Sequence, residues 1–202
     1  MPDDPLRKLL ADRALHTGRR LTLSSGKAST YYFDCKPVTL SADGAPLVGD
    51  AFVQALDALP ASALPAQIRA IGGLTHGADP IVGATMLRAA AQGRPLDGFY
   101  VRKQPKTHGT MRLIENPPPP GTRVVIVEDV VTSGSSALKA VDEAQRAGCI
   151  VAGVIALVDR DEGGAEAIRR QVPGYVALYS RRDFPQIASA GAAPASPSEG
   201  GS

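Results

Sequence analysis

The sequence has few cysteines, little net charge and no long apolar segment. Its two cysteines, Cys35 and Cys149, form no CxxC pair and cannot make a disulfide framework, which favours a reducing compartment. The formal net charge of +2 is too small to attract nucleic acid or a membrane surface in bulk. No apolar run approaches the length of a membrane span, and residues 1–5 lack the apolar region of a secretory signal. We therefore expect a cytoplasmic protein with no nucleic-acid partner and no membrane partner.

The composition is that of one globular domain with a short tail. Hydrophobic residues make up 44% of the 202 residues and charged residues 21%, which is enough apolar material for a core. We predict a single domain over residues 1–187. Residues 188–202 are Ala, Ser, Pro and Gly with one Glu, so they cannot bury enough apolar surface to fold, and we predict a disordered tail.

Short apolar runs alternate with segments of helical period along the chain. A first helix is expected from Pro5, ended by Gly18, and a hairpin is expected over residues 21–33. Further helices are predicted at 47–59, 79–92 and 136–147, strands at 68–71, 98–102, 124–127 and 150–158, a loop at 60–67 and a glycine-rich turn at 72–77. The order strand, helix, strand predicts an α/β fold with a mostly parallel central sheet flanked by helices.

The segment 127–136, VEDVVTSGSS, carries the strongest chemical signal. A buried strand ends in Glu128 and Asp129 and gives way to a loop of hydroxyl residues that opens a helix. Unpaired N–H groups at a helix start favour a bound anion, and Gly134 lets the backbone approach a phosphate closely. Adjacent carboxylates suit sugar hydroxyls or a magnesium-bound ligand. The plainer alternative is a capped helix after a strand, because Ser and Thr are good N-caps anyway.

Three other segments carry candidate binding groups. Residues 100–109, YVRKQPKTHG, gather four cationic donors that suit a pyrophosphate, although a solvated basic loop is the alternative. Arg160 follows the strand at 150–158 and has the fork that pairs with a carboxylate, although from the residue alone a surface arginine is the favoured alternative. The aromatics Tyr32 and Phe33 lie in the hairpin and either contact a ligand or pack in a core.

Together these motifs resemble the type I phosphoribosyltransferases, and among them the orotate phosphoribosyltransferases. The resemblance covers residues 6 to about 178. It rests on the Glu-Asp-x-x-Thr-x-Gly-Ser string, the Arg-Lys-x-x-Lys-x-His-Gly loop, the Ser-Gly-Lys hairpin and the Asp-Arg segment at 159–160. It implies the type I phosphoribosyltransferase fold, with a small N-terminal hood that includes a hairpin at about 18–40. It also implies transfer of a 5-phosphoribosyl group from phosphoribosyl pyrophosphate (PRPP) to orotate, a step of UMP biosynthesis.

The resemblance also implies roles for individual residues. The catalytic residues are expected to be Asp129, Lys106 and Glu128. PRPP is expected to contact Arg102, Lys103, Lys106, His108, Glu128, Asp129, Val130, Val131, Thr132, Ser133, Gly134, Ser135 and Ser136. Orotate is expected to contact Lys27, Tyr32, Phe33, Thr132 and Arg160. Magnesium is expected mainly through PRPP, with no metal site of the protein's own, in a homodimer with shared active sites.

Two departures from the family pattern affect these expectations. Many members carry a lysine where this chain has Ser24, and a Tyr-Lys pair where it has Thr75-His76. We expect Lys27 to supply one of the two charges, and the backbone of Thr75 and His76 to contact the ligand. Two other functions stay open at this point: a regulator with this fold that binds nucleic acid, and a transferase for another base.

Overall fold

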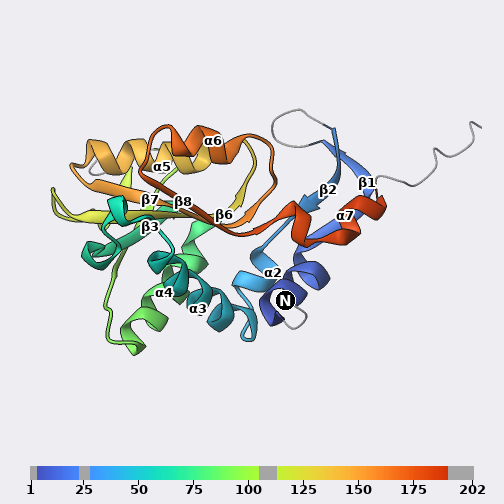
Figure 1. Cartoon of the computed structure of the whole chain (residues 1–202), viewed down its shortest axis with the longest axis horizontal. Helices are drawn as coiled ribbons and strands as arrows, with labels where there is room; N and C mark the ends of the chain where they lie inside the picture. The colour runs from blue at the N-terminus through green and yellow to red at the C-terminus, as the bar shows by residue number, and fades with distance from the viewer. Residues whose placement is uncertain (1–3, 23–27, 105–112, 191–202) are drawn as a thin grey trace, which may run out of the picture.

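A computed structural model of the chain describes residues 4–22, 28–104 and 113–190. The described residues form a six-stranded sheet with helices on both faces, and a separate two-stranded hairpin at one end of the sheet (Figure 1). The fold is the predicted α/β fold with a mostly parallel central sheet.

The central sheet brings the ends of several strands to one edge. Its order is β5 (Ile114–Glu115), β4 (Asp97–Val101), β3 (Ala70–Leu74), β6 (Arg123–Val131), β7 (Ile150–Asp159) and β8 (Gly174–Ser180). All neighbours pair in parallel except β5, which runs antiparallel to β4. The carboxyl ends of β4, β3, β6 and β7 therefore point to the same side, where ligands bind in open α/β sheets.

The strand β6 is buried on both faces of the sheet. Val125 and Val127 belong to the apolar cluster on one face, and Val124 and Ile126 belong to the cluster on the other. Side chains alternate between faces along a strand, so a continuous apolar run suits a strand covered on both sides. The apolar run that predicted this strand therefore has its physical cause in the two layers of helices.

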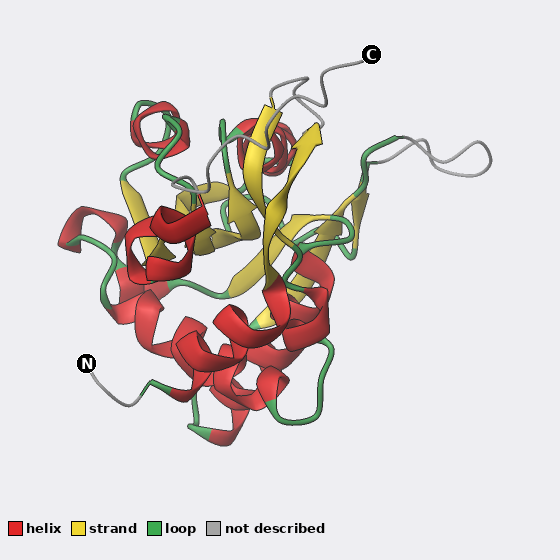
Figure 2. Ribbon diagram, turned by 90° about the vertical axis from the view of Figure 1, so that its right-hand side faces the viewer, coloured by secondary structure: helices red, strands yellow, loops and turns green. Residues whose placement is uncertain are grey.

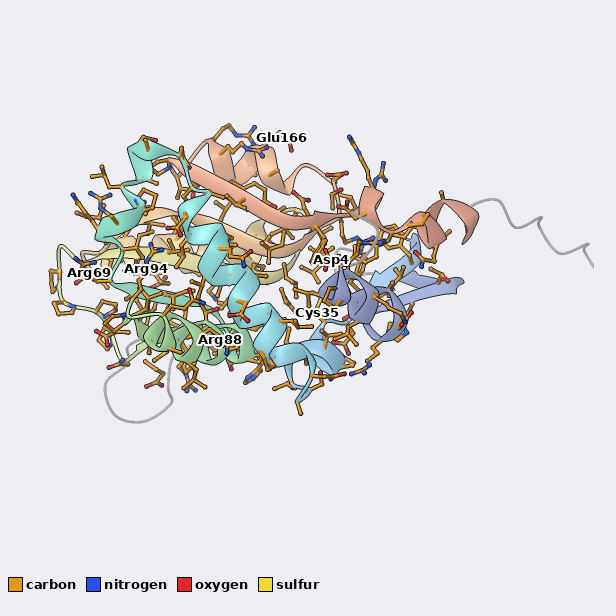
Figure 3. The ribbon with its side chains drawn as sticks, turned by 60° about the horizontal axis from the view of Figure 1, so that its bottom comes forward. Asp4, Cys35, Arg69, Arg88, Arg94 and Glu166 are labelled. Atoms are coloured by element: carbon orange, nitrogen blue, oxygen red, sulfur yellow. The ribbon has the colours of Figure 1, made fainter. Side chains whose placement is uncertain are left out.

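Helices cover the two faces in separate pairs (Figures 1 and 2). One pair is α3 (Gly44–Asp57) and α4 (Ala78–Ala91), and the other is α5 (Ser135–Arg146) and α6 (Gly164–Arg169). Arg88 of α4 and Arg94 just beyond it, both labelled in Figure 3, reach carboxylates of α3, with N–O distances of 2.6 Å to Asp50 and 2.6 Å to Asp57. Two 3₁₀ turns, Ala61–Ala63 and Pro65–Gln67, occupy the predicted loop at 60–67.

No single helix among the described residues is both long and apolar enough to cross a bilayer. Only α3 combined with the short turns at 61–67, which lie at 98° to it, meets the length and composition required.

The N-terminal part forms a small unit at one end of the sheet. It comprises α1 (Pro5–Leu9), a π-helical turn (Leu10–Ala14), the antiparallel pair β1 (Leu15–Thr22) and β2 (Ala28–Phe33), and α2 (Lys36–Thr39). The last described helix, α7 (Pro185–Ala190), lies beside this hairpin (Figure 1). The helix α7 includes the first residues of the predicted tail, and residues 191–202 lie outside the described part of the chain.

Three predicted element ends were wrong. The first helical segment ends at Ala14, and Gly18 lies inside β1, where the pairing register shifts between Thr17 and Leu21. A glycine inside a strand often marks such an irregularity, and this glycine did so instead of ending a helix. The strand predicted at 124–127 continues through Val131 because Glu128 and Val130 still pair with β7. The predicted glycine-rich turn at 72–77 begins inside β3, which runs to Leu74.

The closeness of β3 to its neighbours gives a stability prediction. A methyl group at Gly73 would overlap the carbonyl oxygen of Val127 and lie 2.5 Å from Cβ of Ala78. Overpacking of this kind costs roughly 1–3 kcal/mol, so we expect Gly73→Ala to lower the free energy of unfolding in urea by that amount. Gly83→Ala is the matched control, since open space surrounds Gly83 in α4. Alanine is a better helix former than glycine, so Gly83→Ala should raise the free energy of unfolding by up to about 1 kcal/mol. Equal effects of the two changes would contradict the packing described.

Candidate active site

A cleft of about 670 Å³ opens at the carboxyl ends of the parallel strands. Its lining comes from the hairpin, from the start of α2, from the end of β3 and the turn after it, from the segment after β4, from the end of β6 with the start of α5, and from the residue after β7. The lining residues are Tyr32, Phe33, Lys36, Leu74, Thr75, His76, Gly77, Lys103, Glu128, Asp129, Val130, Val131, Thr132, Ser133, Gly134, Ser135, Ser136, Ala137 and Arg160. The structure thus brings the predicted Glu128–Ser136 segment together with Tyr32, Phe33, Lys103 and Arg160.

The loop between β6 and α5 is built to receive an anion. Gly134 has φ of 81°, a left-handed conformation that favours glycine, and it directly precedes the first residue of α5. No described side chain caps this helix start. Ser133 and Ser135 lie in the cleft with their hydroxyl oxygens 3.2 Å apart. Backbone N–H groups, the helix dipole and hydroxyl groups therefore converge where a phosphate would be stabilised.

Two carboxylates stand next to this anion site. Glu128 is only 7% exposed, and no described group gives a hydrogen bond to its Oε2 atom. Burial raises the pKa of Glu128 well above its ordinary value, and the charge of Asp129 adds to the rise. Asp129 Oδ1 accepts a hydrogen bond from the backbone N–H of Val130 at 2.9 Å. A buried polar atom without a partner is costly, so a ligand hydroxyl at Glu128 would stabilise the site.

Gly77 makes room for one of these carboxylates. A Cβ atom at this position would overlap the carboxylate of Asp129. Only a residue without a side chain lets the turn after β3 approach the end of β6 so closely. The sequence analysis did not single out this glycine, because its use depends on a neighbour 52 positions later in the chain.

The basic segment after β4 is only partly described. Lys103 lines the cleft, and its positive charge lowers the pKa of Glu128, against the larger effect of burial. Arg102 does not contribute to the described lining, and its Nη1 atom lies 3.2 Å from Oε1 of Glu115. Lys106 and His108 lie outside the described residues, as do Lys27 and Ser24 of the hairpin turn.

Arg160 is buried, and neighbouring side chains hold its guanidinium group. It is 3% exposed, its guanidinium carbon lies 4.4 Å from the ring centroid of Tyr31, and Nη2 lies 2.8 Å from Oε1 of Glu162. Its backbone N–H bonds to the carbonyl of Val131 at 2.9 Å, which ties it to the end of β6. A stacked and paired guanidinium keeps its fork in one orientation, which favours recognition of a planar carboxylate.

The hairpin aromatics divide between the cleft and the core. Tyr32 is 40% exposed, whereas the Phe33 ring is buried with its centroid 5.0 Å from that of Phe184. Both residues line the cleft. Successive residues of a strand face opposite sides, so Tyr32 offers its ring to a ligand while Phe33 anchors the hairpin.

The residues between β3 and α4 stand at the mouth of the cleft. Thr75 is fixed by a hydrogen bond from its backbone N–H to the carbonyl of Val101 at 2.8 Å. The His76 side chain is exposed, with Nδ1 3.3 Å from Oδ2 of Asp79. The peptide bond between Thr75 and His76 is cis. Both residues line the cleft, and the expected contact of their backbone with the ligand stays a prediction.

Lys36 is a charged cleft residue that the sequence analysis missed. It lines the cleft, with Nζ 2.6 Å from Oδ1 of Asp34. The available signal was weak: a lysine two positions after the acidic residue that closes the hairpin.

Comparison with known proteins gives consistent matches. No family model matches the chain. A curated orotate phosphoribosyltransferase of Sorangium cellulosum is 46% identical over 178 residues, which cover 87% of this chain and 89% of that protein. One from Rhodopirellula baltica is 44% identical over 182 residues, covering 89% and 92%.

Solved structures of orotate phosphoribosyltransferase from Mycobacterium tuberculosis H37Rv also match. The complex with Fe(III) dicitrate has a TM-score of 0.73 at 39% identity, covering 88% of this chain and 95% of that one. The complex with PRPP has a TM-score of 0.70 at 36% identity, with the same two coverages.

The burial of Glu128 gives a prediction about pH and stability. Folding raises its pKa above the ordinary value of 4.5, so the group adds no penalty where it is protonated in both states. As pH rises from this ordinary value through the folded pKa, the unfolded chain releases the proton while the folded protein still holds it, so the folded protein loses stability. We expect Glu128→Gln to remove this loss, so its melting temperature relative to wild type should rise between about pH 5 and pH 8. Glu166→Gln, an exposed change on α6 (Figure 3), should show a constant difference. A melting-temperature difference between Glu128→Gln and wild type that stays constant over this pH range would refute the raised pKa.

Proposed function

Because the chain belongs to the orotate phosphoribosyltransferase family, we propose that its cleft transfers the 5-phosphoribosyl group of PRPP to orotate. The products are orotidine 5′-monophosphate and pyrophosphate, and the reaction serves UMP biosynthesis. The names of the curated relatives support orotate as the acceptor. They give no support to a nucleic-acid-binding regulator or to a transferase for another base.

One observation carries the proposal: the Glu128–Asp129 pair adjoins the uncapped start of α5 within a single cleft. A sugar phosphate needs these two features side by side. The loop from Thr132 to Ser136 would hold the 5-phosphate through N–H and hydroxyl groups. Glu128 and Asp129 would hold the ribose hydroxyls, which also gives Oε2 of Glu128 the partner it lacks among the described groups.

The base would bind on the other side of the ribose. Arg160 would pair with the orotate carboxylate, and the hairpin residues Tyr32 and Phe33 would bound the base. A ring nitrogen of orotate forms the bond to C1 of the ribose and loses its proton to the leaving pyrophosphate or to water. The bond from C1 to pyrophosphate breaks, and its electron pair leaves with pyrophosphate. The ring nitrogen is itself the nucleophile, so no protein nucleophile is required. The protein would contribute positioning and charge stabilisation.

We propose magnesium as the cofactor, bound chiefly by the substrate. Throughout the described residues, no group of three or more His, Cys, Asp or Glu side chains could hold a metal ion. The oxygens of pyrophosphate and of the ribose hydroxyls are the hard ligands that magnesium prefers. When bound, the ion would neutralise charge on the leaving pyrophosphate. Glu128 and Asp129 would orient the hydroxyls that reach it.

The basic segment from Arg102 to His108 would close over pyrophosphate and exclude water, which could otherwise capture the activated sugar. Lys103 already lines the cleft.

We propose further that the active unit is a homodimer in which Lys106 acts in the neighbouring subunit's site. We place the enzyme in the cytoplasm, where two free buried cysteines suit a reducing compartment.

The acceptor base provides the first test. With PRPP and magnesium, the protein should consume orotate, which is measured by the loss of orotate absorbance. It should leave adenine, hypoxanthine and uracil unchanged.

Arg160→Ala should raise the Michaelis constant for orotate far more than that for PRPP. Loss of a charged hydrogen-bond partner costs on the order of 1.5–3 kcal/mol, or roughly ten- to a hundredfold. Arg169→Ala is the matched control, because Arg169 also stacks on a tyrosine, 5.0 Å from the Tyr175 ring, but does not line the cleft. An unchanged orotate constant in Arg160→Ala would remove Arg160 from the site.

Subunit mixing tests the shared site. Lys106→Ala and Asp129→Asn should each be nearly inactive. In a heterodimer of the two, one site would carry both defects and the other none. Equal mixing with full exchange should therefore restore about one quarter of the wild-type sites. Exchange is verified by native mass spectrometry with one partner isotopically labelled. Proven exchange without recovery would mean that Lys106 acts within its own subunit.

A further inference from the structure

Lys36 is a cleft cation whose role the motifs do not assign. It stands outside the basic segment after β4, at the first residue of α2, and comes from the N-terminal unit. Building on the proposed function, we propose that Lys36 binds the diphosphate group of PRPP.

The backbone around Lys36 is fixed against the end of β6. The preceding residue, Cys35, is fully buried, and its Sγ atom lies 4.0 Å from the carbonyl oxygen of Asp129. Figure 3 labels Cys35 near the N-terminal helices. Val38 and Thr39, which follow Lys36, are buried as well. The start of α2 is therefore anchored beside Asp129, and the lysine side chain leaves from a defined position.

The charge of Lys36 acts on Asp129, one of the two carboxylates that would hold the ribose. Its pKa is raised, chiefly by the hydrogen bond to Asp34, and the negative charges of Asp34 and Asp129 add to that rise. On the other side of the pair, the charge of Lys103 acts on Glu128. Two lysines from separate elements thus each act on one carboxylate of the pair: Lys36, at the start of α2, acts on Asp129, and Lys103, after β4, acts on Glu128.

The position of the diphosphate within PRPP indicates which group Lys36 and Lys103 can bind. Its diphosphate is attached to C1 of the ribose, next to the C2 hydroxyl. A cation close to the carboxylate that holds the ribose hydroxyls is therefore within reach of the diphosphate. The 5-phosphate has its own place at the start of α5, and the base carboxylate has Arg160. The diphosphate also gains negative charge as its bond to C1 breaks, so a nearby ammonium stabilises the transition state.

The ion pair with Asp34 leaves the ammonium available. The side chain of Lys36 is 50% exposed and that of Asp34 is 29% exposed. Exposed pairs of this kind contribute little stability, so a multiply charged ligand can replace the aspartate. An ammonium carries three donors on a flexible stem and can turn from one oxygen to another. In the free enzyme, Asp34 thus holds Lys36 at the edge of the cleft.

Binding measurements on the full chain test this assignment. Isothermal titration calorimetry with magnesium chloride compares PRPP, pyrophosphate and ribose 5-phosphate as ligands. For Lys36→Gln we expect affinity for PRPP and for pyrophosphate to fall about ten- to a hundredfold, the range for a lost charged hydrogen bond. Ribose 5-phosphate should bind as in wild type. Lys36→Arg should recover most of the PRPP affinity. Lys8→Gln, on exposed α1, is the control and should bind all three ligands normally.

Three results would overturn the assignment. The first is unchanged PRPP affinity in Lys36→Gln. The second is an equal loss for ribose 5-phosphate, which would indicate a distorted cleft. The third is that Lys36→Arg binds PRPP no better than Lys36→Gln, which would indicate a structural role. None of these measurements involves orotate. A wild-type chain that binds PRPP without consuming orotate would contradict the proposed function alone, and the titrations would still decide the role of Lys36.

Discussion

The site depends on one constraint: β6 is buried on both faces and carries a carboxylate into its last residues. Apolar side chains on both sides of the sheet hold the strand in place, so Glu128 cannot turn away to water. Burial of such a group is unfavourable unless hydrogen bonds compensate it. The strand thereby presents Oε2 of Glu128, whose partner would be the ligand. Packing fixes the position of this atom in the free protein.

The electrostatics of the cleft follow from this carboxylate pair. Two cations from different parts of the fold act on this pair: Lys36 on Asp129, and Lys103 on Glu128, whose raised pKa Lys103 partly offsets. Arg160 contacts Tyr31 and Glu162, which keep its guanidinium in one orientation. Charges arranged in this way need little reorganisation when a charged ligand binds, and such preorganisation is the main source of electrostatic catalysis.

Two of the errors in element prediction have a common cause, because long-range pairing decided against the local preference. Gly18 can end a helix or interrupt a strand, and the pairing of β1 with β2 selected the second. Glu128 and Asp129 are residue types depleted in strands, and pairing with β7 nevertheless extended β6 past these carboxylates. Local preference is weak, and long-range pairing overrides it.

The sequence by itself determined the α/β fold and the groups of the central motif, because strand, loop and helix start are contiguous from Val124 to Ser136. A contiguous motif needs no distant contact to bring its parts together. Only the tertiary structure placed Lys36, Gly77 and the Tyr31–Arg160–Glu162 group around that motif. Tyr31 and Arg160 are separated by 129 positions, and their contact exists because β2 and the end of β7 meet at the cleft. Proximity of this kind results from packing of whole elements, and no local pattern in the sequence encodes it.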